Sequence, residues 1–84
     1  MLFRSVLKLS KALVSRLHEP GPAAIARALT ELTHVQGGLV VAEGVENEQM
    51  ADQARAVGAD LGQGWLFGRP VRPEPESEPE LVFA

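Results

Sequence analysis

Two polar side chains stand out for the chemistry that they could do. Glu43 closes the apolar run of residues 38–42 and is followed by Gly44, which lets the backbone turn sharply or approach a ligand closely. Gln63 is flanked by glycines on both sides, so its amide projects from an otherwise bare backbone. Such an amide is a good hydrogen-bonding anchor for water or a phosphate oxygen. Glu43 alone would be read as a solvated loop acid, and its pairing with Gln63 indicates the mouth of a site.

The segments around these residues predict the elements that position them. Residues 38–42 form a short, continuous apolar run with β-branched members, typical of a parallel strand covered on both faces. A second short strand is expected near residues 60–64. Strands that alternate with helices predict a parallel α/β architecture. In such folds functional side chains lie where strands end, which is where Glu43 and Gln63 are expected.

Two helices are predicted around the first of these strands. The earlier one should begin at Pro22, place His34 in its last turn as a helix-terminus cation, and stop near Gly37. Its buried stripe is predicted to contain Ile25, Ala28, Leu29 and Leu32. The later helix should be capped by Asn47 and end at Gly58. Its buried residues are predicted to be Met50, Ala54 and Val57.

The first 18 residues fit two alternatives. Helical spacing favours one amphipathic helix, and a short strand over residues 3–9 followed by a helix fits as well. The spacing is carried by Leu2, Val6, Leu9, Leu13 and Leu17.

Composition limits the classes of function. The chain has 84 residues, 45% of them hydrophobic and 23% charged, which allows at most one small globular domain. It has no cysteine, so a metal would depend on oxygen or imidazole ligands, as Mg²⁺ and Mn²⁺ do. No basic cluster is interleaved with aromatics, which argues against nucleic-acid binding, and no apolar stretch reaches the length of a membrane span. We expect a cytoplasmic protein, although the basic N-terminus also fits an organelle transit peptide.

The C-terminal residues have a different composition. Proline and glutamate alternate over residues 73–80 without a cation. That pattern predicts a disordered tail over residues 73–84, after a folded part that spans residues 1–72.

Two motifs carry a resemblance to a known family. Residues 40–46, Val-Val-Ala-Glu-Gly-Val-Glu, and residues 58–70, Gly-Ala-Asp-Leu-Gly-Gln-Gly-Trp-Leu-Phe-Gly-Arg-Pro, resemble the C-terminal part of the EAL domain. This is the bacterial cyclic di-GMP phosphodiesterase family, and the match is close over residues 37–72. The resemblance implies a partial (β/α)₈ TIM-like barrel, about the last three of its eight strand–helix units. Residues 7–10, Leu-Lys-Leu-Ser, resemble the family's Lys-[Ile/Leu]-Asp segment, with Ser10 in place of the usual Asp.

The resemblance also implies roles for individual residues. Complete EAL domains use two Mg²⁺ or Mn²⁺ ions to activate the water that opens cyclic di-GMP to pGpG. By position, Lys8 would lie beside that water and the developing phosphate charge, and Gln63 would orient hydrogen bonds on the metal side. Glu43 would hold a metal-bound water or act as base. Glu46 is expected to stabilise its loop, and Trp65 and Phe67 are expected to pack in the core or at the barrel rim.

Most of the family's metal ligands have no counterpart here. The sequence has no Glu-Ala-Leu motif and no adjacent Asp pair. One or two carboxylates cannot compensate two dications, so we expect no phosphodiesterase activity from this chain alone and no tightly bound metal. The alternative is a non-catalytic module that binds cyclic di-GMP or another protein. Strands taken from a closed barrel leave unpaired edges, which favours self-association or pairing with a partner.

Overall fold

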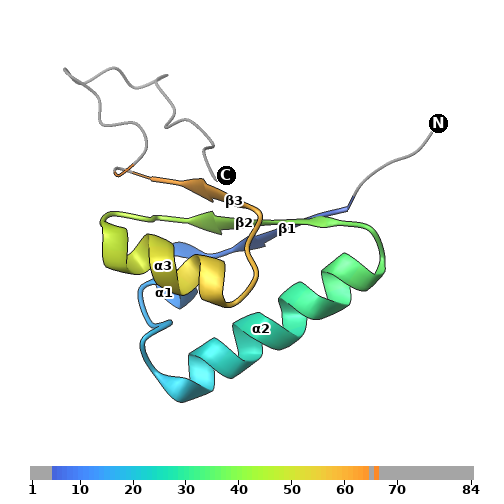
Figure 1. Cartoon of the computed structure of the whole chain (residues 1–84), viewed down its shortest axis with the longest axis horizontal. Helices are drawn as coiled ribbons and strands as arrows, with labels where there is room; N and C mark the ends of the chain where they lie inside the picture. Colours follow the sequence, from blue (N-terminus) through green and yellow to red (C-terminus); the bar gives the residue numbers. More distant parts are fainter. Residues whose placement is uncertain (1–4, 65, 67–84) are drawn as a thin grey trace.

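The computed structural model describes residues 5–64 and Leu66. Three strands, β1 (Val6–Leu9), β2 (Leu39–Glu43) and β3 (Leu61–Gln63), form a parallel sheet in the order β1-β2-β3. The helices are α1 (Lys11–Val14), α2 (Pro20–Val35) and α3 (Glu48–Ala56), and they lie on one side of the sheet (Figure 1). This alternation confirms the predicted parallel α/β architecture. The predictions for Trp65, Phe67 and residues 73–84 lie outside the described residues.

The core is formed between β2 and the helices. Val40, Val41 and Ala42 are all buried, as predicted for this strand, although the described helices cover only one face of the sheet (Figure 1). Val40 and Ala42 belong to the hydrophobic cluster that also contains buried residues of every helix. That cluster consists of Leu9, Val14, Leu17, Ala26, Val40, Ala42, Val45, Ala51, Ala54 and Val57. No helix among the described residues is both long and apolar enough to cross a membrane.

The N-terminal segment follows the second of the two alternatives. Val6–Leu9 is a strand whose residues pair in register with β2, from Val6 with Leu39 to Leu9 with Ala42. The single amphipathic helix suggested by the spacing of residues 2–17 is therefore wrong over β1. A helix begins only after Ser10, whose Oγ accepts a hydrogen bond from the Leu13 amide at 3.2 Å and caps α1.

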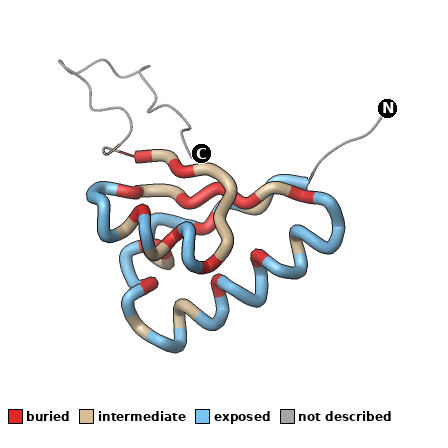
Figure 2. Tube along the Cα trace, in the orientation of Figure 1, coloured by how far each residue is buried: buried red, intermediate tan, exposed pale blue. Residues whose placement is uncertain are grey.

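α2 differs from its prediction at two points. It begins at Pro20 rather than Pro22, because proline is tolerated in the first turn, where amides have no helical partner. Its predicted buried stripe is wrong: the buried residues are Ala26 and Thr30. The four residues predicted to be buried, Ile25, Ala28, Leu29 and Leu32, are exposed. Small side chains let the helix lie close to the sheet, and Figure 2 shows that most of α2 is exposed.

α3 follows its prediction more closely. The Asn47 Oδ1 accepts a hydrogen bond from the Met50 amide at 2.8 Å, which confirms the N-terminal cap. Ala54 and Val57 are buried as predicted, whereas Met50 is half-buried against the core. Gly58 follows the helix with a φ of 100°, the left-handed conformation expected of a terminating glycine.

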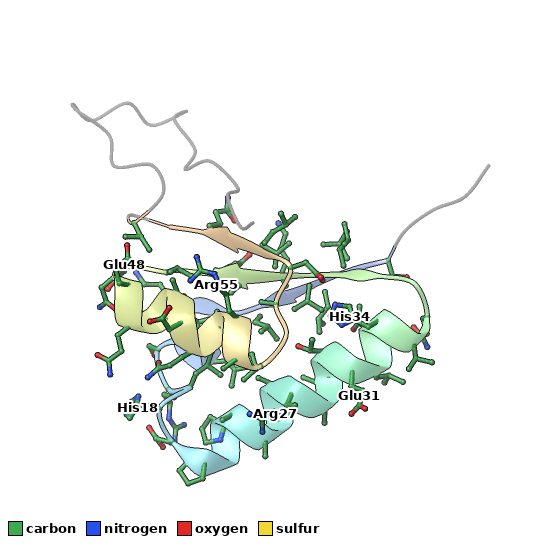
Figure 3. The ribbon with its side chains drawn as sticks, viewed as in Figure 1. His18, Arg27, Glu31, His34, Glu48 and Arg55 are labelled. Carbon is green, nitrogen blue, oxygen red and sulfur yellow. The ribbon has the colours of Figure 1, made fainter. Side chains whose placement is uncertain are left out.

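One carboxylate joins the end of α2 to the sheet. Asp60 Oδ2 accepts a hydrogen bond from the Val40 amide at 2.8 Å and lies 2.7 Å from Nε2 of His34. His34 is in the last turn of α2, as predicted, and lies between that turn and the sheet (Figure 3). The contact with Asp60 was not predicted. It fixes the start of β2 at the amino end of the sheet, opposite to the carboxyl end where Glu43 lies.

Candidate active site

The sheet register places three predicted site residues on one face. Glu43 pairs with Gln63 across β2 and β3, and Lys8 pairs with Val41, two residues before Glu43. Paired residues of a parallel sheet point to the same face, and side chains two residues apart do so too. Lys8, Glu43 and Gln63 therefore share a face. It is the face opposite to Val40 and Ala42, which pack against the helices.

Lys8 and Glu43 form a loose ion pair at the carboxyl end of the sheet. The distance from Lys8 Nζ to Glu43 Oε2 is 4.0 Å, and the two side chains are 61% and 35% exposed. An exposed pair at this distance contributes little stability. The carboxylate therefore lies near a cation but is not tied up in a tight salt bridge, and both groups are accessible to a ligand.

The loop after β2 is fixed to the end of β3 by the backbone of Val45. Its amide donates a hydrogen bond to the Gln63 carbonyl at 3.0 Å, and its carbonyl accepts one from the Leu66 amide at 3.1 Å. Val45 itself is fully buried. A Cβ at Gly64 would overlap the Val45 backbone, and Gly64 has a φ of 155°. The glycine beside Gln63 therefore allows the close approach that fixes Glu43 relative to Gln63.

A second ion pair holds this loop from the other side. Lys11 Nζ lies 3.7 Å from Glu46 Oε2, so the first turn of α1 contacts the loop that follows Glu43. Gly44 has a φ of 74° and lies against the Lys11 side chain. The pair agrees with a loop-stabilising role for Glu46. Both side chains are well exposed, which makes this a weak contact.

The donor set does not fit a metal centre by itself. Among residues 5–64 and Leu66, no group of three or more His, Cys, Asp or Glu side chains is placed to hold a metal ion. Glu43 supplies one carboxylate to the shared face, Gln63 supplies an amide oxygen, and Lys8 supplies a positive charge that opposes a cation. Hard divalent cations need several oxygen ligands. Within the described residues, these three side chains do not form a complete metal cradle.

Comparison with known proteins identifies the family. The EAL domain family matches residues 4–70. The chain belongs to the EAL domain family. Over 71 residues it is 35% identical to the bifunctional diguanylate cyclase/cyclic di-GMP phosphodiesterase MucR of Pseudomonas aeruginosa. The alignment covers 83% of this chain and 10% of MucR.

Solved EAL structures have the same arrangement of elements. The EAL enzyme Bd1971, in a form with cAMP and cyclic di-GMP bound, is 35% identical and superposes with a TM-score of 0.72. The PaMucR phosphodiesterase in complex with cyclic di-GMP is 34% identical, with a TM-score of 0.69. The chain covers 18% of the former and 27% of the latter. It is therefore a partial EAL barrel, and the face that carries Glu43 corresponds to the inside of the barrel.

Sequence reasoning singled out the three residues on this face but missed the Val45 backbone, which fixes Glu43 relative to Gln63. Val45 has an ordinary apolar side chain, and its role depends on backbone contacts between two distant segments. The available signal was Gly64, because a glycine beside a site residue indicates close approach of another backbone.

Proposed function

We propose that this EAL chain forms one wall of a cyclic di-GMP phosphodiesterase site, which becomes complete only together with the rest of the barrel. The observation that carries the proposal is the register that puts Lys8, Glu43 and Gln63 on one inner face. The substrate is inferred from relatives: MucR is named a cyclic di-GMP phosphodiesterase, and PaMucR was solved with cyclic di-GMP.

Each residue has a role that its chemistry supports. Lys8 is a mobile cation suited to offset charge that develops on a phosphodiester during hydrolysis. Glu43, 4.0 Å from it, can orient a water molecule or accept its proton. Gln63 can accept or donate a hydrogen bond beside Glu43 and so hold that water in line. In the complete domain Mg²⁺ or Mn²⁺ would supply the remaining electrostatic stabilisation.

The chain alone is proposed to be inactive. The single carboxylate of Glu43 cannot offset the charge of two dications, and residues that act as a unit lose nearly all of their rate when most of the unit is missing. Incubation of the chain with cyclic di-GMP and Mg²⁺ or Mn²⁺ should yield no pGpG by chromatography. Turnover that Glu43→Ala abolishes would contradict this.

A chimera tests the site residues in a complete barrel. Residues 4–70 would replace the matching segment of the PaMucR phosphodiesterase domain. The chimera should hydrolyse cyclic di-GMP, and Glu43→Gln should lower kcat by about 100-fold or more, as expected for loss of a general base. Glu48→Gln, at an exposed acid of α3, is the matched control and should leave kcat unchanged. A folded chimera in which Glu43→Gln retains full activity would overturn the assignment.

The second candidate is a non-catalytic module in the cytoplasm. The incomplete donor set of the described residues favours it. Such a module would bind cyclic di-GMP without turnover, or associate with itself or another protein through the sheet edges. Binding by the chain and by a chimera that never hydrolyses the nucleotide would support this function over the first.

A further inference from the structure

Two lysines from one segment of the chain reach the loop that carries Glu43. Lys8 belongs to β1, and its Nζ lies 4.0 Å from Glu43 Oε2. Lys11 is the first residue of α1, and its Nζ lies 3.7 Å from Glu46 Oε2. The two pairs have the same spacing, because the lysines and the glutamates are each three positions apart. Glu46 therefore has a cation of its own, and Lys8 remains the partner of Glu43.

The position of Lys11 is fixed by the end of β1. Leu9, two residues before Lys11, is buried and is the register partner of Ala42, which directly precedes Glu43. Ser10 then caps α1 with its hydroxyl oxygen. The side chain of Lys11 therefore starts from a backbone that is anchored next to the backbone of Glu43.

The methylene stem of Lys11 lies on the backbone of Gly44. A Cβ built on Gly44 would overlap Cγ of Lys11 and would lie 2.9 Å from its Cβ and 3.1 Å from its Cδ. Gly44 has a φ of 74°, and glycine has more conformational freedom than any other residue. The stem covers one side of this turn, so it leaves fewer conformations open to the residue that directly follows Glu43.

The stem of Lys11, rather than its charge, is the part that can restrict the turn. The side chains of Lys11 and Glu46 are 68% and 45% exposed, and an exposed ion pair contributes little stability. A lysine stem can pack along a surface while its ammonium group stays in water. On the other side of the loop, the Val45 amide is bonded to the Gln63 carbonyl. Glu43 thus lies between a side-chain contact from the β1 side and a backbone contact from β3.

We propose that Lys11 is a positioning residue for Glu43. Its methylene stem limits the conformations of Gly44 and so holds the Glu43 carboxylate on the face that it shares with Gln63. This rests on the proposed function, in which Glu43 orients a water molecule or accepts its proton. Lys11 acts through Gly44, so its loss should lower kcat through poorer alignment and leave substrate binding nearly unchanged.

Two substitutions separate the stem of Lys11 from its charge. Lys11→Met keeps most of the stem and removes the charge, whereas Lys11→Ala removes both. Alanine and methionine both favour helices, so α1 should persist in each variant.

The first measurement uses the chimera of residues 4–70 with the PaMucR phosphodiesterase domain. Lys11→Ala should lower kcat by about 3- to 10-fold and change KM by less than about twofold. Lys11→Met should keep at least about half of the kcat of the unsubstituted chimera, because the stem remains. Arg27→Ala, at an exposed cation of α2, is the control and should leave both constants unchanged.

Hydrogen exchange of the chain itself tests the positioning without catalysis. The Val45 amide donates to the Gln63 carbonyl at 3.0 Å and reports the order of the loop. By NMR it should exchange at least about threefold faster in Lys11→Ala, because loops with fewer contacts open more often. In Lys11→Met it should exchange at the wild-type rate. The Val40 amide, near the other end of β2, is the internal reference and should not change.

The outcomes separate the proposal from its alternatives. An unchanged kcat or unchanged Val45 exchange in Lys11→Ala would overturn the positioning role, and the second result would mean that Lys11 does not act through the loop. Equal losses in Lys11→Ala and Lys11→Met would assign the effect to the charge and overturn the role of the stem. An unsubstituted chimera without activity would count against the proposed function alone, because exchange at Val45 would still decide the role of Lys11.

Discussion

Glu43 on β2 and Gln63 on β3 are register partners, so the carboxylate and the amide leave neighbouring parallel strands at the same level and on the same face. The two residues are 20 positions apart in sequence, and helix α3 between them returns the chain to the amino end of the sheet. The pair is therefore a product of sheet register. The side chains that could do chemistry are therefore different from those that stabilise the fold. The free energies of unfolding of single variants can test this difference.

Glu43→Gln should change the free energy of unfolding by less than about 1 kcal/mol, because its exposed ion pair with Lys8 is loose. Val40→Ala, on the same strand but fully buried, should cost about 2–3 kcal/mol through lost burial and a cavity. Urea denaturation of both variants checks the contrast. Equal losses would mean that Glu43 is a structural residue.

Gly64→Ala should destabilise the chain by about 2 kcal/mol or more, because its Cβ would overlap the Val45 backbone. Gly21→Ala is the matched control. Gly21 lies in the first turn of α2, where an added Cβ would meet nothing within 4 Å beyond its chain neighbours and the helix's own backbone. The usual gain from alanine in a helix is opposed there by the ring of Pro22, so the substitution should change stability by less than about 1 kcal/mol. Thermal unfolding should shift to a clearly lower temperature in Gly64→Ala and only slightly in Gly21→Ala. A shift of the same sign and size would argue against the close approach at Gly64.

Asp60→Ala should cost about 1–3 kcal/mol, since it leaves the amide of buried Val40 without its carboxylate acceptor. Asp60→Asn keeps a side-chain oxygen and should cost less. The local signature is faster hydrogen exchange at the Val40 amide, read by NMR. Unchanged exchange in Asp60→Ala would show that this hydrogen bond does not protect the start of β2.

The Arg16–Glu19 pair should give a small dependence of stability on pH. Arg16 donates hydrogen bonds of 3.1 and 2.9 Å to the Glu19 carboxylate, which lower the pKa of Glu19 below its ordinary value. A carboxyl with a lowered pKa in the folded state stabilises the fold above its ordinary pKa. That contribution is lost as pH falls through the lowered value.

Arg16→Gln checks the cause of this shift. In an NMR titration of the Glu19 carboxyl, the midpoint of the variant should lie above that of the wild type. An unchanged midpoint would assign the lowered pKa to something other than Arg16.

The sequence predicted β2, β3, the Asn47 cap and the positions of Glu43 and Gln63 at the ends of strands, because each depends on local signals. A β-branched apolar run, a capping asparagine and a carboxylate before glycine keep their meaning wherever the segment lies. The side of α2 that is buried could not be predicted in the same way. Helical spacing finds an apolar face but not its neighbour, and small residues such as Ala26 met the sheet instead of Leu29.

The strand β1 shows the opposite difficulty. Its four residues fit a helical period equally well, and only the backbone pairing with β2 decides between the alternatives. The link between His34 and Asp60 also escaped prediction, since it joins residues 26 positions apart that have no common motif. Contacts of this kind depend on the assembled fold and leave no periodic signal in the chain.

The backbone of Val45 bonds at its amide to Gln63 and at its carbonyl to Leu66, and its side chain is fully buried. Residues 43–46, residues 62–64 and Leu66 consequently form one structural unit built from two separate segments of the chain. If the Glu43 loop is grafted into another parallel α/β scaffold, Gly64 and its neighbours must be transferred with it. Otherwise the loop lacks the hydrogen bonds that fix the position of the Glu43 carboxylate. A side chain at position 64 would clash with backbone atoms of Val45. Only a shift of that backbone would relieve the clash, and a smaller side chain at position 45 would not.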